Sequence, residues 1–200
     1  KEFLDENGRI KESSYILDML NVKYEIYQDV VLPRLQSEDR AYFTKEIQVG
    51  DKDRESRFNN LYLSDKKPSD ILFITSNVLN LSSRTFAVEE SDIIESFDNS
   101  NPNELIVKVE TSGPQFLAVS EVFYPNGWKA TINNEETNIY EVNDLIRGVY
   151  IDKKGLHTIR MWFDPSDLKW GKTFSYVGFL VILILLFFKR VQNVVIQKRI

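Results

Sequence analysis

The sequence predicts a mainly β fold: an antiparallel, jelly-roll-like β-sandwich with a few short helices, followed by one C-terminal transmembrane helix. Two observations carry this prediction. Between residues 104 and 163, apolar segments of strand length recur about every 8–12 residues with turn residues between them, a pattern typical of sandwiches. Near the C-terminus, residues 173–188 carry no charge and consist mostly of Leu, Ile, Val and Phe, which is typical of a membrane span.

The apolar segment is short for a span unless its ends are anchored. Residues 174–188 would form a helix about 22 Å long, against a hydrocarbon core of about 30 Å, and counting from Trp170 gives about 28 Å. Trp170 at one end and Lys189 and Arg190 at the other are suitable interfacial anchors. We therefore predict a transmembrane helix at residues 169–190. A buried helix of a soluble protein is the disfavoured alternative, because such helices rarely lack a polar position over this length.

The charges around the span predict its orientation. The excess of Lys and Arg lies after it, at positions 189, 190, 198 and 199, so the positive-inside rule places the C-terminus in the cytoplasm. We expect an extracytoplasmic β-sandwich domain with an N-terminal α/β segment at residues 1–168 and a cytoplasmic basic tail at residues 191–200. The tail is either an interfacial helix or a plain stop-transfer segment.

Composition excludes several classes of site. The 200 residues carry a net charge of −5, whereas a nucleic-acid interface needs clustered Lys and Arg, so we expect no nucleic-acid partner. The chain has no cysteine, which excludes disulfides, thiolate metal sites and Cys nucleophiles. It begins Lys-Glu-Phe, without a signal peptide, and a translocated domain needs a signal or an upstream span. We therefore expect the C-terminal piece of a longer membrane protein.

The first hundred residues predict short mixed elements. Residues 11–20 suit a helix capped by Ser13 or Ser14, and residues 22–26 alternate as a half-buried strand. Residues 41–49 suit a strand, and residues 51–60 suit a solvated helix. Residues 71–75 suit either a helix or a strand, and residues 84–88 lead into the strand-rich part of the chain.

The second half predicts strands separated by turns. The nearly all-apolar segment 115–124 is expected to be a central strand, and Asn133 and Asn134 suit a tight hairpin because Asn tolerates positive φ. The other strands are expected at residues 105–109, 128–132, 137–142, 146–151 and 156–163. The last of these strands ends shortly before the span, so we expect the sandwich to lie close to the membrane surface.

Six short segments of the chain form a recognisable series: SEVFYPNGWKA, NDLIRGVY, GLHTI, FDPS, LNVKY and RAYF, at residues 120–130, 143–150, 155–159, 163–166, 20–24 and 40–43. In their order along the chain they resemble signature segments of the YfhO-type bacterial polytopic membrane proteins. Asn126 interrupts the usual Pro-Gly-Trp, Asn133–Asn134 replaces Asp-Gly, and Phe163 replaces Tyr. These departures concern turn geometry and not membership.

The resemblance implies a function for the longer protein. Proteins of this type look like GT-C glycosyltransferases, so this chain would be the C-terminal accessory domain and last span of a bacterial cytoplasmic-membrane enzyme. That enzyme would transfer a sugar from a polyprenyl-phosphate carrier, the implied donor, to a cell-envelope glycan or lipid acceptor. The acidic catalytic residue of the superfamily would lie upstream of Lys1, so the resemblance assigns no catalytic residue and no cofactor to this piece. Its partners would be membrane lipids, upstream transmembrane helices and a glycan or lipid-linked acceptor.

Two other classes of function stay open. A non-enzymatic, membrane-anchored glycan-binding or assembly module would carry a similar sandwich and anchor. A soluble glycosidase would require two carboxylates facing a cleft, about 5–10 Å apart.

The candidate substrate-binding residues are Glu121, Tyr124, Trp128, Arg147 and Tyr150. Glu121 and Arg147 lie in strands that can be neighbours, either as a structural ion pair or as contacts to a glycan or lipid phosphate. Aromatic side chains stack on the apolar C–H faces of sugars, which suits the two Tyr residues and Trp128. For Trp128 the alternative is a place in the sandwich core.

The remaining polar residues predict structure and not chemistry. Residues 89–90 and 135–136 are pairs of Glu, but neighbours on a strand point to opposite faces, so we expect solvated surface. His157 is the single His and shares its parity with apolar residues, so we expect it to be structural and expect no metal site. No Gly-rich phosphate loop is present.

Overall fold

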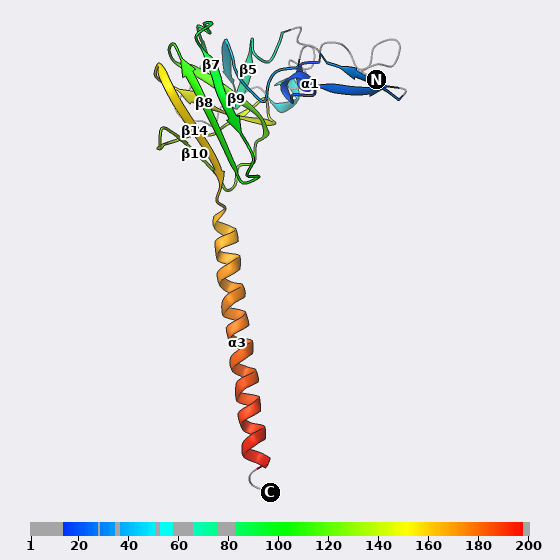
Figure 1. Ribbon diagram of the computed structural model, residues 1–200, viewed down its shortest axis with the longest axis vertical. Helices are drawn as coiled ribbons and strands as arrows, with labels where there is room; N and C mark the ends of the chain where they lie inside the picture. Colours follow the sequence, from blue (N-terminus) through cyan, green and yellow to red (C-terminus); the bar gives the residue numbers. More distant parts are fainter. Residues whose placement is uncertain are drawn as a thin grey trace. The chain divides into compact units, whose positions relative to one another are not determined.

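The fold is mainly β with an apolar C-terminal helix, as the sequence predicts (Figure 1). The computed structural model describes residues 14–27, 29–34, 37–50, 53–57, 66–75 and 83–197. The chain divides into two compact units, Lys1–Phe163 and Asp164–Ile200.

The first unit contains a five-stranded sheet with the order β11-β10-β14-β8-β7. Every pair of neighbours in it is antiparallel. Its strands are β7 (Ile93–Asp98), β8 (Glu104–Thr111), β10 (Trp128–Ile132), β11 (Glu135–Thr137) and β14 (Gly155–Phe163). Strand β7 lies in a segment where we predicted no strand. Only its side chains Ile94 and Phe97 pack against the core, so its sequence lacks the regular apolar alternation of the other strands.

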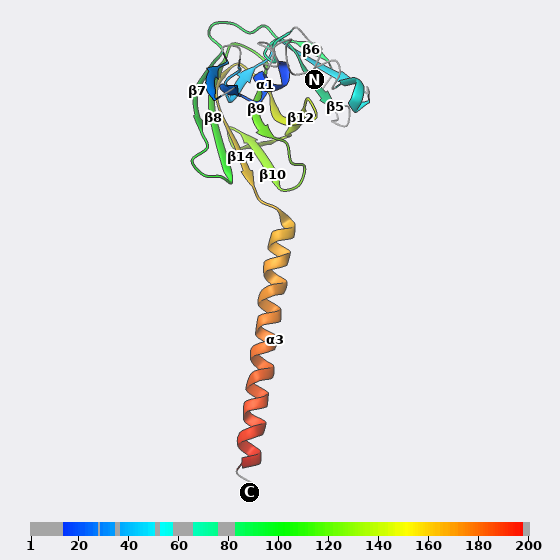
Figure 2. The same cartoon turned by 90° about the vertical axis from the view of Figure 1, so that its right-hand side faces the viewer.

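A seven-stranded sheet packs against it, with the order β3-β9-β13-β12-β5-β4-β6 (Figure 2). Its strands are β3 (Ala41–Phe43), β4 (Glu46–Gly50), β5 (Leu72–Thr75), β6 (Arg84–Thr85), β9 (Gln115–Val122), β12 (Tyr140–Val142) and β13 (Ile146–Ile151). Strands β4 and β5 pair in parallel, and the other neighbours are antiparallel.

Strand β9 is buried on both faces, which explains its nearly continuous apolar sequence. Leu117 and Val119 point into the core between the two sheets. Phe116 and Ala118 point the other way, into a second core beneath the short helix α1 (Tyr15–Met19). The predicted central strand is therefore confirmed, although it ends at Val122.

Alternation also holds along β14. His157, Ile159 and Met161 are buried between the sheets, while the residues between them are more exposed. Asn133 and Asn134, with φ of 52° and 69°, form the tight turn between β10 and β11, as expected. These observations confirm the predicted hairpin and the structural position of His157.

Helix α1 is shorter than predicted and is held by polar contacts. The Tyr15 hydroxyl donates a hydrogen bond to the Ile71 carbonyl, and Asp18 forms a buried ion pair with Arg34 at 2.8 Å. Ser14 makes no side-chain capping bond, so its predicted role as a cap is wrong. The predicted first turn of the helix, including Ser13, lies outside the described residues.

The hairpin of β1 (Tyr24–Tyr27) and β2 (Val30–Pro33) corrects the predicted half-buried strand. Tyr24 and Ile26, the residues we expected to be buried, are 66% and 76% exposed. Their alternation with charged residues correctly predicted a strand. Among the described residues this strand belongs to a sheet of two strands, and the side chains of Tyr24 and Ile26 stay exposed. Alternation therefore predicted the strand correctly and its burial incorrectly.

Two other predicted strands are each divided. The segment 41–49 forms β3 and β4, which lie apart in the same sheet, and the segment 137–142 crosses from β11 in one sheet to β12 in the other. Residues 71–75 adopt the strand alternative as β5. Of the predicted helix at residues 51–60, residues 54–57 are helical and several of the others lie outside the described residues.

The second unit contains α3 (Ser166–Gln197), a helix of 32 residues and thus about 48 Å long. Its part Ser166–Lys189 is long and apolar enough to cross a membrane. The helix therefore starts three residues before the predicted span. The hydroxyls of Thr173 and Ser175 donate to the carbonyls of Lys169 and Gly171 at 2.9 Å, so both polar groups are satisfied inside the helix.

Candidate functional site

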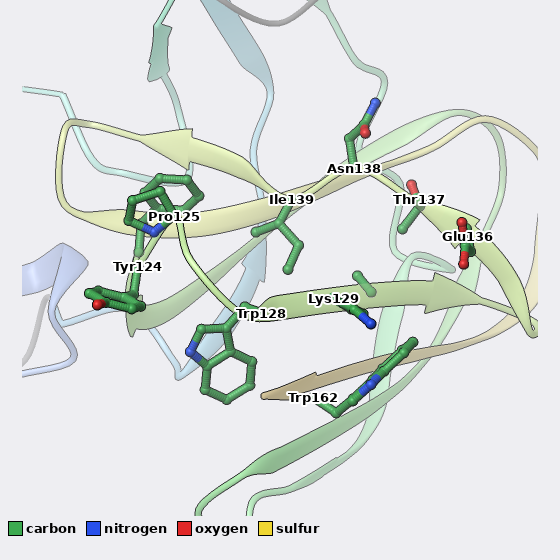
Figure 3. A pocket seen from close by; sticks show the side chains of 11 residues that line it. Tyr124, Pro125, Trp128, Lys129, Glu136, Thr137, Asn138, Ile139 and Trp162 are labelled. Atoms are coloured by element: carbon green, nitrogen blue, oxygen red, sulfur yellow. The ribbon is translucent and has the colours of Figure 1, made fainter. Parts of the chain in front are cut away.

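An aromatic pocket of about 350 Å³ lies at the β10–β11 edge of the five-stranded sheet (Figure 3). Strand β11 pairs only with residues 130–132 of β10, so Trp128 and Lys129 have no strand partner on that side among the described residues. The chain then leaves the sheet through Asn138 and Ile139 toward β12. The shortness of β11 thus leaves the space that becomes the pocket.

Four aromatic side chains, from β10, β14 and the segment between β9 and β10, give the pocket its character. They are Phe123, Tyr124, Trp128 and Trp162, and Lys129, Glu136 and Asn138 add polar groups. In Figure 3, Tyr124 and Pro125 lie at one end and Glu136 at the other, with Trp128 and Trp162 on the strands between them. Aromatic surface combined with a few polar groups is the composition that binds sugars.

Trp128 is half-buried and contacts two neighbouring side chains. Its ring centroid lies 5.6 Å from that of Phe163, and the Arg147 guanidinium carbon lies 3.9 Å from its ring centroid on β10. Trp128 packs against the core, as one of the two alternatives predicted, and it also lines the pocket, where sugar binding stays a prediction. Tyr124 packs on the same Phe163 with centroids 6.3 Å apart and is 54% exposed.

Arg147 is the unusual polar group of this site. Its side chain is 5% exposed, and its Nε and Nη1 atoms have no hydrogen-bond acceptor among the described residues. Burial lowers the pKa of Arg147 from its ordinary value, and the negative charge of Glu121 partly opposes this. A buried guanidinium with unsatisfied nitrogen atoms lowers the stability of the fold. Its presence here therefore suggests a role other than stabilisation.

Glu121 and Arg147 lie on neighbouring strands, as expected, with Oε2 and Nη2 4.0 Å apart. The closer partner of Glu121 is Arg40, which donates a hydrogen bond to its Oε1. Arg40 also stacks over Phe97, so it is fixed on that side. Glu121 is thus shared by two arginines, and the group carries a net positive charge.

Tyr150 lies apart from the other four candidates. Its hydroxyl accepts a hydrogen bond from Arg84 Nη1 at 2.9 Å, and it lines a second cavity of about 560 Å³ with Asp152, Lys153 and His157. The structure therefore brings Glu121, Tyr124, Trp128 and Arg147 together and does not place Tyr150 with them.

Sequence reasoning missed three contributors to this site. Trp162 lies opposite Lys129 on the outer face of β14, and its parity with exposed Arg160 was the available signal. Arg40, which holds Glu121, is separated from it by 81 residues and gave no local signal. Asn138 was predicted inside a strand at residues 137–142, whereas it lies between β11 and β12, where the chain crosses between the sheets.

The acidic groups of the described residues do not form a metal site. No cluster of three or more His, Cys, Asp or Glu side chains suited to a metal occurs in the parts of the chain that the structure describes. Glu136 is the one carboxylate that lines the aromatic pocket among those residues. Glu89, Glu90, Glu135 and Glu136 are exposed, in agreement with solvated surface.

The residues that we predicted to be membrane anchors, Trp170, Lys189 and Arg190, lie on α3. Trp170 stacks on Phe174 with ring centroids 6.0 Å apart, and Lys169 pairs with Asp164 at 2.7 Å. Lys189 ends the apolar segment, and the helix continues through Arg190 to Gln197.

Comparisons of the chain with protein-family models, with curated proteins and with solved structures gave no match.

Proposed function

We propose that the first unit is an extracytoplasmic glycan-binding domain that α3 anchors in a membrane. Following the resemblance, it is the C-terminal accessory domain and last span of a polyprenyl-phosphate-dependent glycosyltransferase of the bacterial cytoplasmic membrane. Its role there is to hold the cell-envelope glycan or lipid acceptor. The observation that carries the proposal is the aromatic pocket with Tyr124, Trp128 and Trp162.

The pocket supports binding in preference to cleavage. Glycoside hydrolysis requires two carboxylates on opposite sides of a bond, and Glu136 is alone among the described residues that line this pocket. Lys129, Glu136 and Asn138 offer donors and acceptors for sugar hydroxyls. Arg147 acts as a positioning residue, because its guanidinium lies on the face of Trp128 and holds the ring in place.

The same observation favours a second candidate. A non-enzymatic, membrane-anchored glycan-binding or assembly module would use the same pocket without any transferase. The two candidates differ in what the rest of the protein does, so a measurement of glycan transfer in cells separates them.

The test uses cells that lack the protein and are complemented with the whole protein or its variants. Trp162→Ala is expected to reduce the envelope glycan modification at least severalfold at unchanged protein level, because one of the aromatic side chains that line the pocket is lost. Leu156→Ala is the matched control, since Leu156 is an exposed apolar residue on the same strand outside the pocket. If the glycan modification is the same with and without the protein, and the same in Trp162→Ala, the glycosyltransferase proposal is contradicted. If the purified chain nevertheless binds sugar, the second candidate, a non-enzymatic binding module, is supported.

The orientation is tested separately by labelling. The chain has no cysteine, so single cysteines can be introduced at Lys154, in the exposed turn after β13, and at Gln192, after the span. A membrane-impermeant maleimide added to intact cells is expected to label Lys154→Cys and not Gln192→Cys. The reverse pattern would contradict the proposed side of the membrane.

A further inference from the structure

The aromatic pocket and the second cavity adjoin each other. Both are lined by Glu136, Thr137 and Asn138, the residues that end β11 and cross toward β12. Glu136 and Asn138 are exposed, and Thr137 is half-buried. The crossing segment is therefore a shared wall with hydrogen-bonding side chains that both cavities contact.

The two cavities have similar chemistry, because each combines aromatic rings with polar side chains. The first has the rings of Tyr124, Trp128 and Trp162 beside its polar groups. The second has the rings of Tyr140 and Tyr150, with Asp152 and Lys153 at its rim. Stacking platforms accept the apolar faces of sugar rings, and polar side chains select their hydroxyls, so the pair suits a ligand that repeats the same unit.

The second cavity is held in shape by fixed contacts. The hydroxyl of Tyr150 accepts from Arg84, and the Nε2 atom of His157 lies 2.9 Å from the Lys153 carbonyl oxygen. The Nδ1 atom of His157 lies 3.2 Å from Asn133 Nδ2, so both ring nitrogens of this buried His have partners. Such preorganisation lowers the cost of ordering side chains when a ligand binds.

The combined length of the two cavities sets a minimum ligand length. Along β10 the lining runs from Trp128 in the first cavity to Ile132 in the second. Four residues of strand span about 13 Å, which is longer than one sugar ring. A ligand that fills both cavities must therefore contain more than one ring.

We propose that the two cavities are successive subsites of one site for a linear oligosaccharide of several units, which lies across residues 136–138. This inference rests on the proposed function and specifies its ligand as an oligomeric glycan chain. The aromatic pocket holds one end by stacking, and Asp152 and Lys153 bind the hydroxyls of a unit farther along the chain.

The test is a length series of sugars measured by calorimetry on the whole chain in lipid nanodiscs. The probes are homo-oligomers of glucose, galactose and N-acetylglucosamine, one to six units long. For at least one series we expect six units to bind at least tenfold more tightly than one unit. The double variant Asp152→Ala, Lys153→Ala should remove most of that gain, because both side chains are exposed and belong to the second cavity.

Two further variants make the outcomes distinguishable. Trp162→Ala should weaken binding at every length, and Leu156→Ala should change none. Two results would overturn the elongated site: equal affinity for one and six units, or an unchanged affinity of the double variant for six units. The glycan-binding proposal would stand in either case. Absence of binding for every probe would overturn both.

Discussion

Replacing Arg147 by Met separates a structural role of this residue from a functional one. Met keeps a long apolar side chain against Trp128 and removes the buried charge. The substitution would remove a cation–π contact with Trp128, which is worth about 0.5–2 kcal/mol. It would also remove the 4.0 Å ion pair with the partly exposed Glu121, which is worth about 0–1 kcal/mol. The substitution would also remove two buried nitrogen atoms, Nε and Nη1, that have no acceptor among the described residues and cost about 1–3 kcal/mol each.

These magnitudes predict that Arg147→Met lowers the free energy of unfolding by no more than about 1 kcal/mol, or raises it. Arg34→Met is the matched control. Its side chain is 2% exposed and lies 2.8 Å from Asp18, so its removal leaves a buried, uncompensated carboxylate and costs about 3–5 kcal/mol. Urea unfolding of the detergent-solubilised chain, followed by tryptophan fluorescence, measures both. A loss of 3 kcal/mol or more for Arg147→Met would refute the reasoning and make Arg147 a structural ion-pair partner.

Two further predictions concern stability. Gly148→Ala should lower the free energy of unfolding by about 1–3 kcal/mol, because the new methyl group would lie 2.6 Å from Phe116 Cε1. Gly113→Ala is the control and should change the free energy of unfolding little, because the space around Gly113 is open. Equal values for the two variants would contradict this packing. Burial raises the pKa of Tyr15, so its stabilisation is complete below about pH 10 and is lost as pH rises toward the folded-state pKa, because the unfolded state releases its proton first. Tyr15→Phe should therefore flatten the alkaline fall in stability, and an unchanged slope would count against it.

Local patterns predicted the β-rich half of the chain well. Alternation placed the buried face of β14, positive φ at Asn133 and Asn134 followed from their residue type, and the continuous apolar run of β9 indicated burial on two faces. Each of these signals resides in the segment itself. The apolar span in α3 was equally local.

Features that depend on distant partners were not predictable. The exposure of Tyr24 and Ile26 depends on whether another element covers the hairpin, and alternation alone cannot report that. The split of residues 137–142 between two sheets depends on where each half finds a neighbour.

The candidate site shows the same division. Glu121 and Arg147 were found from residue type and strand order, whereas Arg40 was missed because its contact with Glu121 spans 81 residues. Tyr150 was grouped with the other aromatic residues by type, and its contact with Arg84 places it at a different cavity.

The most direct test of glycan binding uses the three tryptophans of the chain. Trp128 and Trp162 line the aromatic pocket, and Trp170 lies on α3 as an internal reference. Their indole N–H signals can be followed by NMR in nanodiscs while the tightest-binding sugar oligomer is titrated. We predict saturable shifts of the Trp128 and Trp162 signals with the Trp170 signal unchanged. Shifts confined to Trp170, or no shift of any of the three, would contradict binding at this pocket.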